Sequence, residues 1–181
     1  MDKIINEQDL IQRCLNNERS AHEIFYKLHS DKMFSVCMYY ATSRDEACDI
    51  LQDAYITIFK KLHTFKFNGS LEGWVRRIVV NTALTHIRKN KKVFDLFTTV
   101  ENLPEYVEDD TLELDEIPRK KIVQLVNELP TKAALVMKLF SIEGYTHQEI
   151  AEKLEITVGT SKSQLNRARL LLKSAIEKLN L

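Results

Sequence analysis

The stretch Thr146-His-Gln-Glu-Ile-Ala-Glu-Lys-Leu-Glu-Ile-Thr-Val-Gly-Thr-Ser-Lys-Ser-Gln-Leu-Asn-Arg-Ala-Arg169 decides the fold of the C-terminal part of the chain. Its apolar residues follow a helical period that is interrupted once, near residue 155. The core that two such helices would share consists of Ile150, Leu154, Ile156 and Leu165. Because Ala151 is small, the two helices can cross closely. The spacing therefore predicts a helix-turn-helix.

The second of these helices is expected to carry the contact surface. Thr157 is a good N-cap for it. Its early turns are expected to expose Thr160, Ser161, Lys162, Ser163, Gln164, Asn166 and Arg167. Short polar, amide and cationic groups of this kind contact phosphates and base edges in a major groove, whereas a hairpin with a merely solvated polar face is the alternative. Glu155 lies where the turn favours a left-handed glycine, at a cost on the order of 1 kcal/mol.

Helical periodicity also covers most of the sequence before this motif, and the whole chain has only four glycines and three prolines. Apolar residues recur at helical spacing in the series Ile24, Leu28, Val36 and in the series Ile50, Ala54, Ile58, Leu62. The predicted helices span residues 7–17, 20–41, 44–62, 71–90, 118–128, 131–141, 146–154 and 158–179. Capping-box spacing marks three helix starts, at Ser20 to Glu23, Ser43 to Glu46 and Thr146 to Glu149.

Charge is balanced overall but unevenly distributed, with 26 basic and 26 acidic side chains. Residues 60–92 hold nine basic side chains and one acid, whereas residues 101–116 hold eight acids and no base. This reversal separates a candidate polyanion-binding surface from an acidic segment without amphipathic period. We therefore predict an all-α protein of two small domains, an N-terminal helical bundle at 1–92 and a C-terminal helix-turn-helix domain at 118–181, joined by an acidic flexible linker at 93–117.

An aromatic loop, His63-Thr-Phe-Lys-Phe-Asn-Gly-Ser70, precedes the basic helix of the first domain. Near one face of that helix lie Trp74, Ile78, Ala83 and Ile87, and along another lie Arg77, Asn81, Arg88 and Lys92. One interpretation makes Trp74 a core anchor and the cations a solvated face. The loop rings Phe65 and Phe67 favour another, in which aromatic rings stack unpaired bases while cations follow the phosphates.

With these motifs the chain resembles bacterial RNA polymerase sigma factors of the extracytoplasmic-function type, over roughly residues 10–92 and 118–179. The first block, Ala47-Cys-Asp-Ile-Leu-Gln-Asp-Ala-Tyr55, is similar to the family helix A-x-D-x-x-Q-[DE]-x-[FY], which docks on the clamp helices of polymerase. The resemblance implies that the polymerase contacts are Asp49, Gln52 and Asp53. Their spacing alone places them on one helix face as a polar, anionic stripe, for which a solvated surface is the alternative.

The second block joins the aromatic loop to Trp74-x-x-x-Ile78-x-x-Asn81. It resembles the family segment that melts promoter DNA and holds a flipped base of the minus-10 element. By that resemblance the minus-10 contacts are Phe65, Lys66, Phe67, Asn68, Trp74, Arg77, Asn81 and Arg88. Thr85 replaces an aspartate that is common in the family, and Val79 replaces a usual alanine, so no minus-10 sequence preference is predicted.

The third block runs from Leu129-Pro130 through Arg167-Ala-Arg169 and resembles the family's minus-35-binding domain. Ser161 stands where valine is common, and Gln164 stands where arginine is common. The implied minus-35 contacts are Thr160, Lys162, Ser163, Gln164, Asn166 and Arg167. Among these, Gln164 and Asn166 are expected to carry the sequence preference that is particular to this chain.

The resemblance implies a sigma factor that has no enzymatic activity and needs no cofactor. Its expected partners are core RNA polymerase, through the clamp helices of the largest subunit and the flap, promoter DNA in duplex and single-stranded form, and an anti-sigma factor. Larger sigma factors have a folded middle domain where this chain has residues 93–117. That acidic segment is either an RNA mimic in the polymerase channel or a solubilising tether.

Two other classes of binding protein stay open, namely a dimeric operator-binding regulator and a helical module that binds RNA or protein. Enzymatic classes have no support, because the sequence contains no Walker loop, GxSxG elbow or nucleotide fingerprint. The five histidines lack the spacing of a metal site. Cys14, Cys37 and Cys48 are expected to be reduced core residues of a cytoplasmic protein. No stretch approaches the roughly 18 apolar residues of a membrane span, so no direct membrane insertion is expected.

Overall fold

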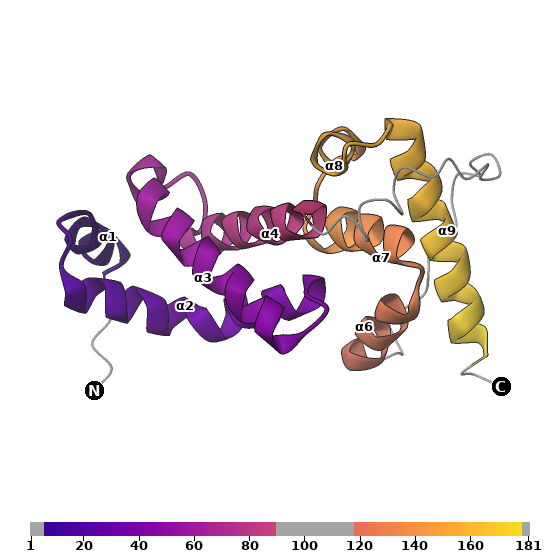
Figure 1. Cartoon of the computed structure of the whole chain (residues 1–181), viewed down its shortest axis with the longest axis horizontal. Helices are drawn as coiled ribbons and strands as arrows, with labels where there is room; N and C mark the ends of the chain where they lie inside the picture. Colours follow the sequence, from indigo (N-terminus) through magenta and orange to yellow (C-terminus); the bar gives the residue numbers. More distant parts are fainter. Residues whose placement is uncertain (1–5, 90–117, 179–181) are drawn as a thin grey trace. The chain divides into compact units, whose positions relative to one another are not determined.

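The structure is a computed structural model that describes residues 6–89 and 118–178. The chain divides into two compact units, the first ending at Lys89 and the second beginning at Asn90. Both units are built from helices in the part of the chain that is described (Figure 1). The predicted all-α class is therefore confirmed. The predicted linker at 93–117 and the predicted domain boundary at residue 92 lie outside the described residues.

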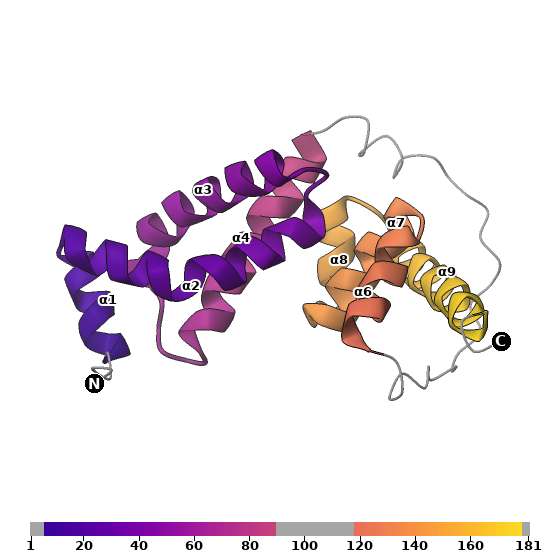
Figure 2. The ribbon, with the colours of Figure 1, turned by 90° about the horizontal axis from the view of Figure 1, so that it is seen from below.

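Unit 1 is a helical bundle whose elements are α1 (Glu7–Leu15), α2 (Arg19–Tyr40), α3 (Arg44–Lys61), the 3-10 turn η1 (Leu62–Thr64) and α4 (Leu71–Lys89). Each of α2, α3 and α4 contacts the other two, and α1 packs against α2 and η1. In Figure 2, α3 runs alongside α2, and α4 crosses α2 at an angle. This packing leaves one face of α3, with Asp49, Gln52, Asp53 and Ile56, exposed to solvent.

The core of unit 1 follows the predicted period on α3 but not on α2. Ile50, Ala54, Ile58 and Leu62 are all buried, as predicted. On α2 the predicted series holds only at its last member, Val36, because Ile24 is half-buried and Leu28 is 48% exposed. The buried face of α2 lies one position further on and contains Phe25, Met33 and Val36. A rotation of one residue turns a helix by about 100°, which suffices to bring a different apolar stripe to the core.

The three predicted capping boxes have different outcomes. Thr146 and Glu149 form the reciprocal box at the start of α8. Ser43 caps the amide of Glu46, but the Glu46 carboxylate accepts from the amide and hydroxyl of Thr42 instead of completing the box. The predicted capping box at Ser20 does not form, because α2 already begins at Arg19.

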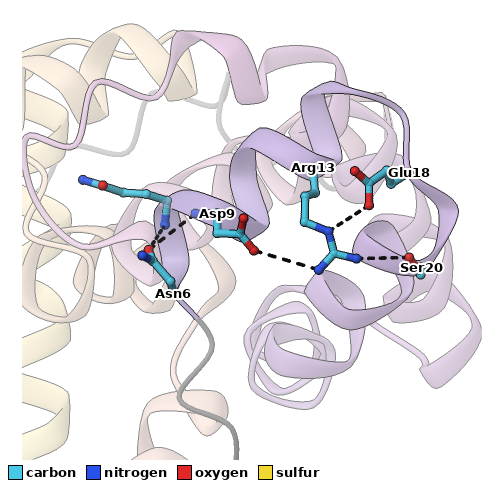
Figure 3. A network of polar contacts seen from close by, with 6 residues as sticks. Asn6, Asp9, Arg13, Glu18 and Ser20 are labelled. Carbon is cyan, nitrogen blue, oxygen red and sulfur yellow. Dashed lines mark hydrogen bonds and ion pairs between the residues drawn. The ribbon is translucent and has the colours of Figure 1, made fainter.

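Arg13 explains the different start of α2. Its Nε donates to the Glu18 carboxylate at 2.8 Å, and its Nη2 donates to the Ser20 hydroxyl at 3.3 Å. Figure 3 shows the Arg13 side chain reaching from α1 to these two residues, with Asp9 on its other side. The Ser20 hydroxyl is thus used to fasten α1 to α2, while Asn6 caps α1 through the amides of Gln8 and Asp9.

Unit 2 contains α6 (Arg119–Glu128), α7 (Thr131–Met137), the π-helical turn η2 (Lys138–Ile142), α8 (His147–Leu154) and α9 (Val158–Glu177). Helix α9 contacts α6, α7 and α8, and it carries the buried residues Leu165, Ala168, Leu172 and Ile176. The predicted helix 131–141 is regular only as far as Met137. From Lys138 the backbone widens into η2, a rare conformation that is found mostly as single turns within helices.

The turn between α8 and α9 is the one predicted from the sequence. Glu155 is left-handed, with φ 54° and ψ 42°, and the amide of Ile156 donates to the Ala151 carbonyl at 3.0 Å. Thr157 caps α9 by accepting from the Thr160 amide at 3.0 Å. These features orient α9 against α8 as a helix-turn-helix.

The cysteines are free thiols. Cys14 and Cys37 are buried as predicted, while Cys48 is half-buried. Burial raises the pKa of the Cys37 thiol to about 12, so this side chain stays protonated and acts as a core residue.

Candidate nucleic-acid interface

Three aromatic rings form a cluster at the surface between α3 and α4. The ring centroids of Phe65 and Phe67 lie 4.9 Å apart, and those of Phe65 and Trp74 lie 5.6 Å apart. Phe65 and Trp74 are half-buried, whereas Phe67 is 46% exposed. The two inner rings thus support an outer ring that faces solvent, which is the arrangement of a stacking platform for a base.

The backbone of Phe67 is unusual for a bulky residue. Its φ is 58°, in the left-handed region, and such conformations cost about 1–3 kcal/mol. The loop is held at both ends: the Phe65 amide donates to the Leu62 carbonyl at 3.1 Å, and the Ser70 hydroxyl accepts from the Gly73 amide at 3.1 Å. Gly73 suits this cap, because a Cβ there would lie 2.9 Å from the Ser70 hydroxyl. An exposed ring on a strained, anchored backbone indicates function rather than packing.

The other predicted minus-10 residues extend this surface along α4. Lys66, Asn68 and Arg77 are exposed, and Asn81 and Arg88 are half-buried. Arg88 is 14 positions after Trp74, a separation of about 21 Å along a helix. The structure therefore brings together Phe65, Phe67 and Trp74 in one cluster and spreads the remaining residues over a longer path.

The predicted polymerase stripe on α3 is exposed. Asp49, Gln52 and Asp53 all face solvent on one side of the helix. The sequence reasoning missed Ile56, which continues the same stripe at the next turn and is 53% exposed. Its place seven residues after Asp49 could have revealed it, because i, i+3, i+4 and i+7 share a helix face.

A second missed residue is His86 on α4. Its Nε2 lies 2.8 Å from the Asp53 Oδ2, and this contact joins α3 to α4. The pair connects the stripe on α3 to α4, the helix that carries Trp74 of the aromatic cluster. No sequence signal predicts it, because 33 residues separate the two side chains.

On α9 the structure corrects two of the predicted exposures. Ser161 is completely buried and Gln164 is 2% exposed, so the expectation that both side chains face DNA is wrong. The physical reason is their position: Gln164 lies one turn after Ser161 and one turn before Ala168, within the stripe that packs on the rest of unit 2. Polarity suggested exposure, but helical position determined burial.

The remaining predicted residues of α9 are accessible. Lys162 is exposed, and Thr160, Ser163, Asn166 and Arg167 are half-buried. The Thr160 and Thr157 hydroxyls are hydrogen-bonded to each other at 2.9 Å, and the Ser163 hydroxyl donates to the Thr160 carbonyl at 3.0 Å. Lys162 and Asn166 lie four residues apart and therefore share one face of the helix.

Gln164 gives a stability prediction. Within the described residues its buried Oε1 has no hydrogen-bond partner, and an unpaired buried polar group costs about 1–3 kcal/mol. Gln164→Met removes this group at similar volume, so we expect a free energy of unfolding higher by about 1 kcal/mol. Chemical denaturation measures it, with Gln164→Glu as a control that should destabilise. A stability loss for Gln164→Met would mean that the amide makes a favourable contact.

Within residues 6–89 and 118–178, no three His, Cys, Asp or Glu side chains come together in a way that could hold a metal ion. Among the helices of those same ranges, none combines the length and apolar character needed to cross a membrane.

Comparison with protein families decides between the classes left open by the sequence. The model described as Sigma-70 region 2 matches residues 25–93, and the model described as Sigma-70, region 4 matches residues 119–172. The two matches contain the aromatic cluster with the α3 stripe and the helix-turn-helix, respectively. The chain belongs to the sigma-70 family. A sigma-70 factor recognises promoters for transcription initiation as a partner of core RNA polymerase, and it is not an enzyme.

Similar curated proteins span the whole of this sigma-70 factor. The RNA polymerase sigma-H factor of Pseudomonas aeruginosa is 24% identical, covering 96% of this chain and 95% of that protein. The ECF RNA polymerase sigma-E factor of Escherichia coli strain K12 is 25% identical, covering 99% of this chain and 98% of that protein. With its two sigma regions, the chain is a factor of the extracytoplasmic-function type.

A solved structure supports the fold. CnrH, in complex with the cytosolic domain of CnrY, aligns with a TM-score of 0.50 at 16% identity, over 95% of this chain and 97% of that one. At this identity the likeness concerns the arrangement of the helices alone. The structural resemblance therefore agrees with the family match without assigning any residue of this sigma factor.

Proposed function

We propose that unit 1 of this sigma factor captures an unpaired base of the minus-10 element on the aromatic cluster of Phe65, Phe67 and Trp74. The observation that carries the proposal is Phe67, whose exposed ring is held out by a left-handed backbone. Bases stack on such rings whatever their identity, while cations bind the phosphates on either side. Lys66, Asn68, Arg77, Asn81 and Arg88 would follow the single strand along α4.

The stripe on α3 would bind polymerase. Asp49, Gln52 and Asp53 offer two carboxylates and an amide, and Ile56 adds an apolar contact that would be desolvated on binding. A cationic helix pair on the largest subunit, its clamp helices, would complement this surface. Unit 2 would make a second polymerase contact at the flap, so that core polymerase fixes the spacing of the two units on DNA.

On α9 the proposed minus-35 contacts are Thr160, Lys162, Ser163, Asn166 and Arg167. Gln164 is left out because its side chain is buried. Lys162 is suited to a phosphate, and Asn166 is suited to the paired donor and acceptor of an adenine edge. The sequence preference that was expected from two residues would thus depend mainly on Asn166.

The two α9 contacts predict different binding defects. Lys162→Ala should weaken binding to all duplexes alike and reduce the slope of log affinity against log salt by about 0.9, because one phosphate contact is lost. Asn166→Ala should cost about 1–3 kcal/mol on the preferred duplex and relax the preference at one base pair. Fluorescence anisotropy over a salt series and a set of single-base variants measures both. Equal effects of the two substitutions on every duplex would contradict this assignment.

The experiment that tests the proposal as a whole is reconstituted transcription. The purified chain is added to bacterial core polymerase with genomic DNA from the same source, and transcript starts are sequenced. We expect starts that share one element near minus-10 and one near minus-35. Transcripts that start without shared upstream elements would overturn the proposal.

Regulation and location complete the proposed function. CnrH was solved in complex with the cytosolic domain of CnrY; for this chain we propose a bound protein partner, an anti-sigma factor, that covers its polymerase surface. The factor would act in the cytoplasm, where core polymerase and promoters are. Co-purification of the native chain from uninduced and induced cells checks both points, since the partner should leave and polymerase should replace it on induction.

A further inference from the structure

The side chain of His147 is held from two sides at the start of α8. Its ring stacks on Phe140 of η2, with centroids 4.6 Å apart and planes 22° apart. Its Nδ1 lies 2.9 Å from the hydroxyl of Ser161 on α9. The imidazole thus links the π-helical turn η2, α8 and α9, the second or recognition helix of the helix-turn-helix, and its orientation is fixed by these contacts.

The burial of Ser161 determines which ring nitrogen carries the proton. Its side chain is 0% exposed, so its hydroxyl cannot donate to water. Across the described residues, the partner of this hydroxyl is His147 Nδ1. Because a buried hydroxyl requires an acceptor, it donates to Nδ1, and the ring proton must reside on Nε2. Ser161 therefore selects the tautomer of His147.

The surroundings also keep the ring neutral. Burial lowers the pKa of His147, and the nearby charges of Lys162 and Arg169 lower it further. The carboxylate of Glu149, two positions further along α8, accepts from the amide and the hydroxyl of Thr146 at 2.9 and 3.0 Å. At physiological pH the imidazole is therefore a neutral group with one donor, the Nε2–H.

That donor faces away from the groups that orient the ring. Nε2 is opposite Nδ1 on the imidazole, and no side chain or carbonyl in residues 118–178 accepts from it. The side chain is only half-buried, and the two cations that influence its pKa belong to the recognition helix. A fixed neutral donor near two cations is complementary to an anion bound across α8 and α9.

We propose that His147 donates a hydrogen bond from Nε2 to a backbone phosphate of duplex DNA and is a positioning residue for the recognition helix. The inference rests on the proposed minus-35 function of unit 2. In helix-turn-helix complexes the first helix crosses the DNA backbone while the second enters the major groove. Phosphate contacts of this type fix register without reading sequence. His147 would set how deeply α9 enters the major groove, and Ser161 would set the direction in which the Nε2–H of His147 points.

The binding test uses the full chain with a minus-35 duplex and a scrambled duplex, over a salt series. His147→Asn keeps an acceptor near Ser161 but loses the distal donor, so we expect about tenfold weaker binding to both duplexes. The salt slope should stay unchanged, because no cation is lost, whereas Lys162→Ala should reduce it by about 0.9. Ser161→Ala should weaken binding less than His147→Asn, and the double variant should bind no more weakly than His147→Asn alone.

Nuclear magnetic resonance of the His147 ring nitrogens gives a readout that a purely structural role would not change. The free chain should show the Nε2–H tautomer, Ser161→Ala should lose that preference, and duplex DNA should shift the Nε2 proton. Wild-type affinity in His147→Asn, a loss confined to the minus-35 duplex, or an Nδ1–H tautomer would each overturn the inference. If His147→Asn, Lys162→Ala and Asn166→Ala all bind DNA normally, the proposed minus-35 function of unit 2 is wrong. If His147→Asn alone binds normally, only the role of His147 is wrong.

Discussion

Replacing Asp49 and Gln52 together by alanine is expected to abolish stable binding to core polymerase while leaving the fold intact. Both side chains are exposed on α3, so their removal opens no cavity. Central polar anchors of an interface cost at least about 2 kcal/mol each when truncated, and two of them would weaken binding by more than a hundredfold. Asp53 is better left in place, because its carboxylate also holds His86 and its loss would disturb the contact between α3 and α4.

A matched control removes one acid and one amide elsewhere in the same unit. Gln8 on α1 and Asp31 on α2 are exposed and lie outside the stripe, so Gln8→Ala with Asp31→Ala should bind core polymerase normally. Surface plasmon resonance on immobilised core measures both variants, and thermal unfolding verifies that they are folded. If the variant with Asp49 and Gln52 replaced bound core polymerase normally, the assignment of the polymerase contact to α3 would be wrong.

Phe67→Ala is expected to leave promoter binding in duplex form intact and to impair strand opening. Alanine removes the stacking surface of one base, which is worth about 1–3 kcal/mol, so the open complex should be roughly 5- to 150-fold less populated. Permanganate reactivity of unpaired thymines in the minus-10 region measures the open fraction. Phe67→Tyr keeps the ring and should open DNA like the unsubstituted chain.

The backbone at Phe67 supplies a second control for strand opening. Phe67→Gly removes the ring and also relieves the left-handed strain at φ 58°, so the protein should become more stable while DNA opening is lost. Opposite changes in stability and opening would separate a binding role from a folding role. If Phe67→Ala and Phe67→Gly both opened promoters normally, the ring would have no part in base capture.

The elements with strong local signals could be predicted from the sequence. The starts of α3 and α8 were predicted, because Ser43 and Thr146 cap amides only three residues away. The cap of α1 by Asn6 was not predicted. The left-handed turn at Glu155 was predicted for the same reason, since its geometry depends on the flanking helices alone. Local hydrogen bonds require only short-range information, which a pattern of residues contains.

The features that were missed depend on contacts between distant segments. The Asp53–His86 pair and the His147–Ser161 pair join residues 33 and 14 positions apart. Gln164 and Ser161 were expected to be exposed because their side chains are polar, yet packing of α9 on several other helices buries them. The predicted core positions in the first half of α2, Ile24 and Leu28, were also wrong, since two apolar stripes compete on that helix and only tertiary packing selects one.

The number of residues in the π-helical turn η2 determines which side chains it presents to α8. Its five residues, Lys138–Ile142, include one more than a regular α-helical path would need. Deleting one of them would restore an ordinary helix at little cost in backbone hydrogen bonds, but the side chains that follow the deletion within the turn would rotate by about 100° relative to α7. Phe140 would then leave the ring of His147. The ring contact between η2 and the start of α8 therefore depends on a single extra residue in the turn that precedes the helix-turn-helix.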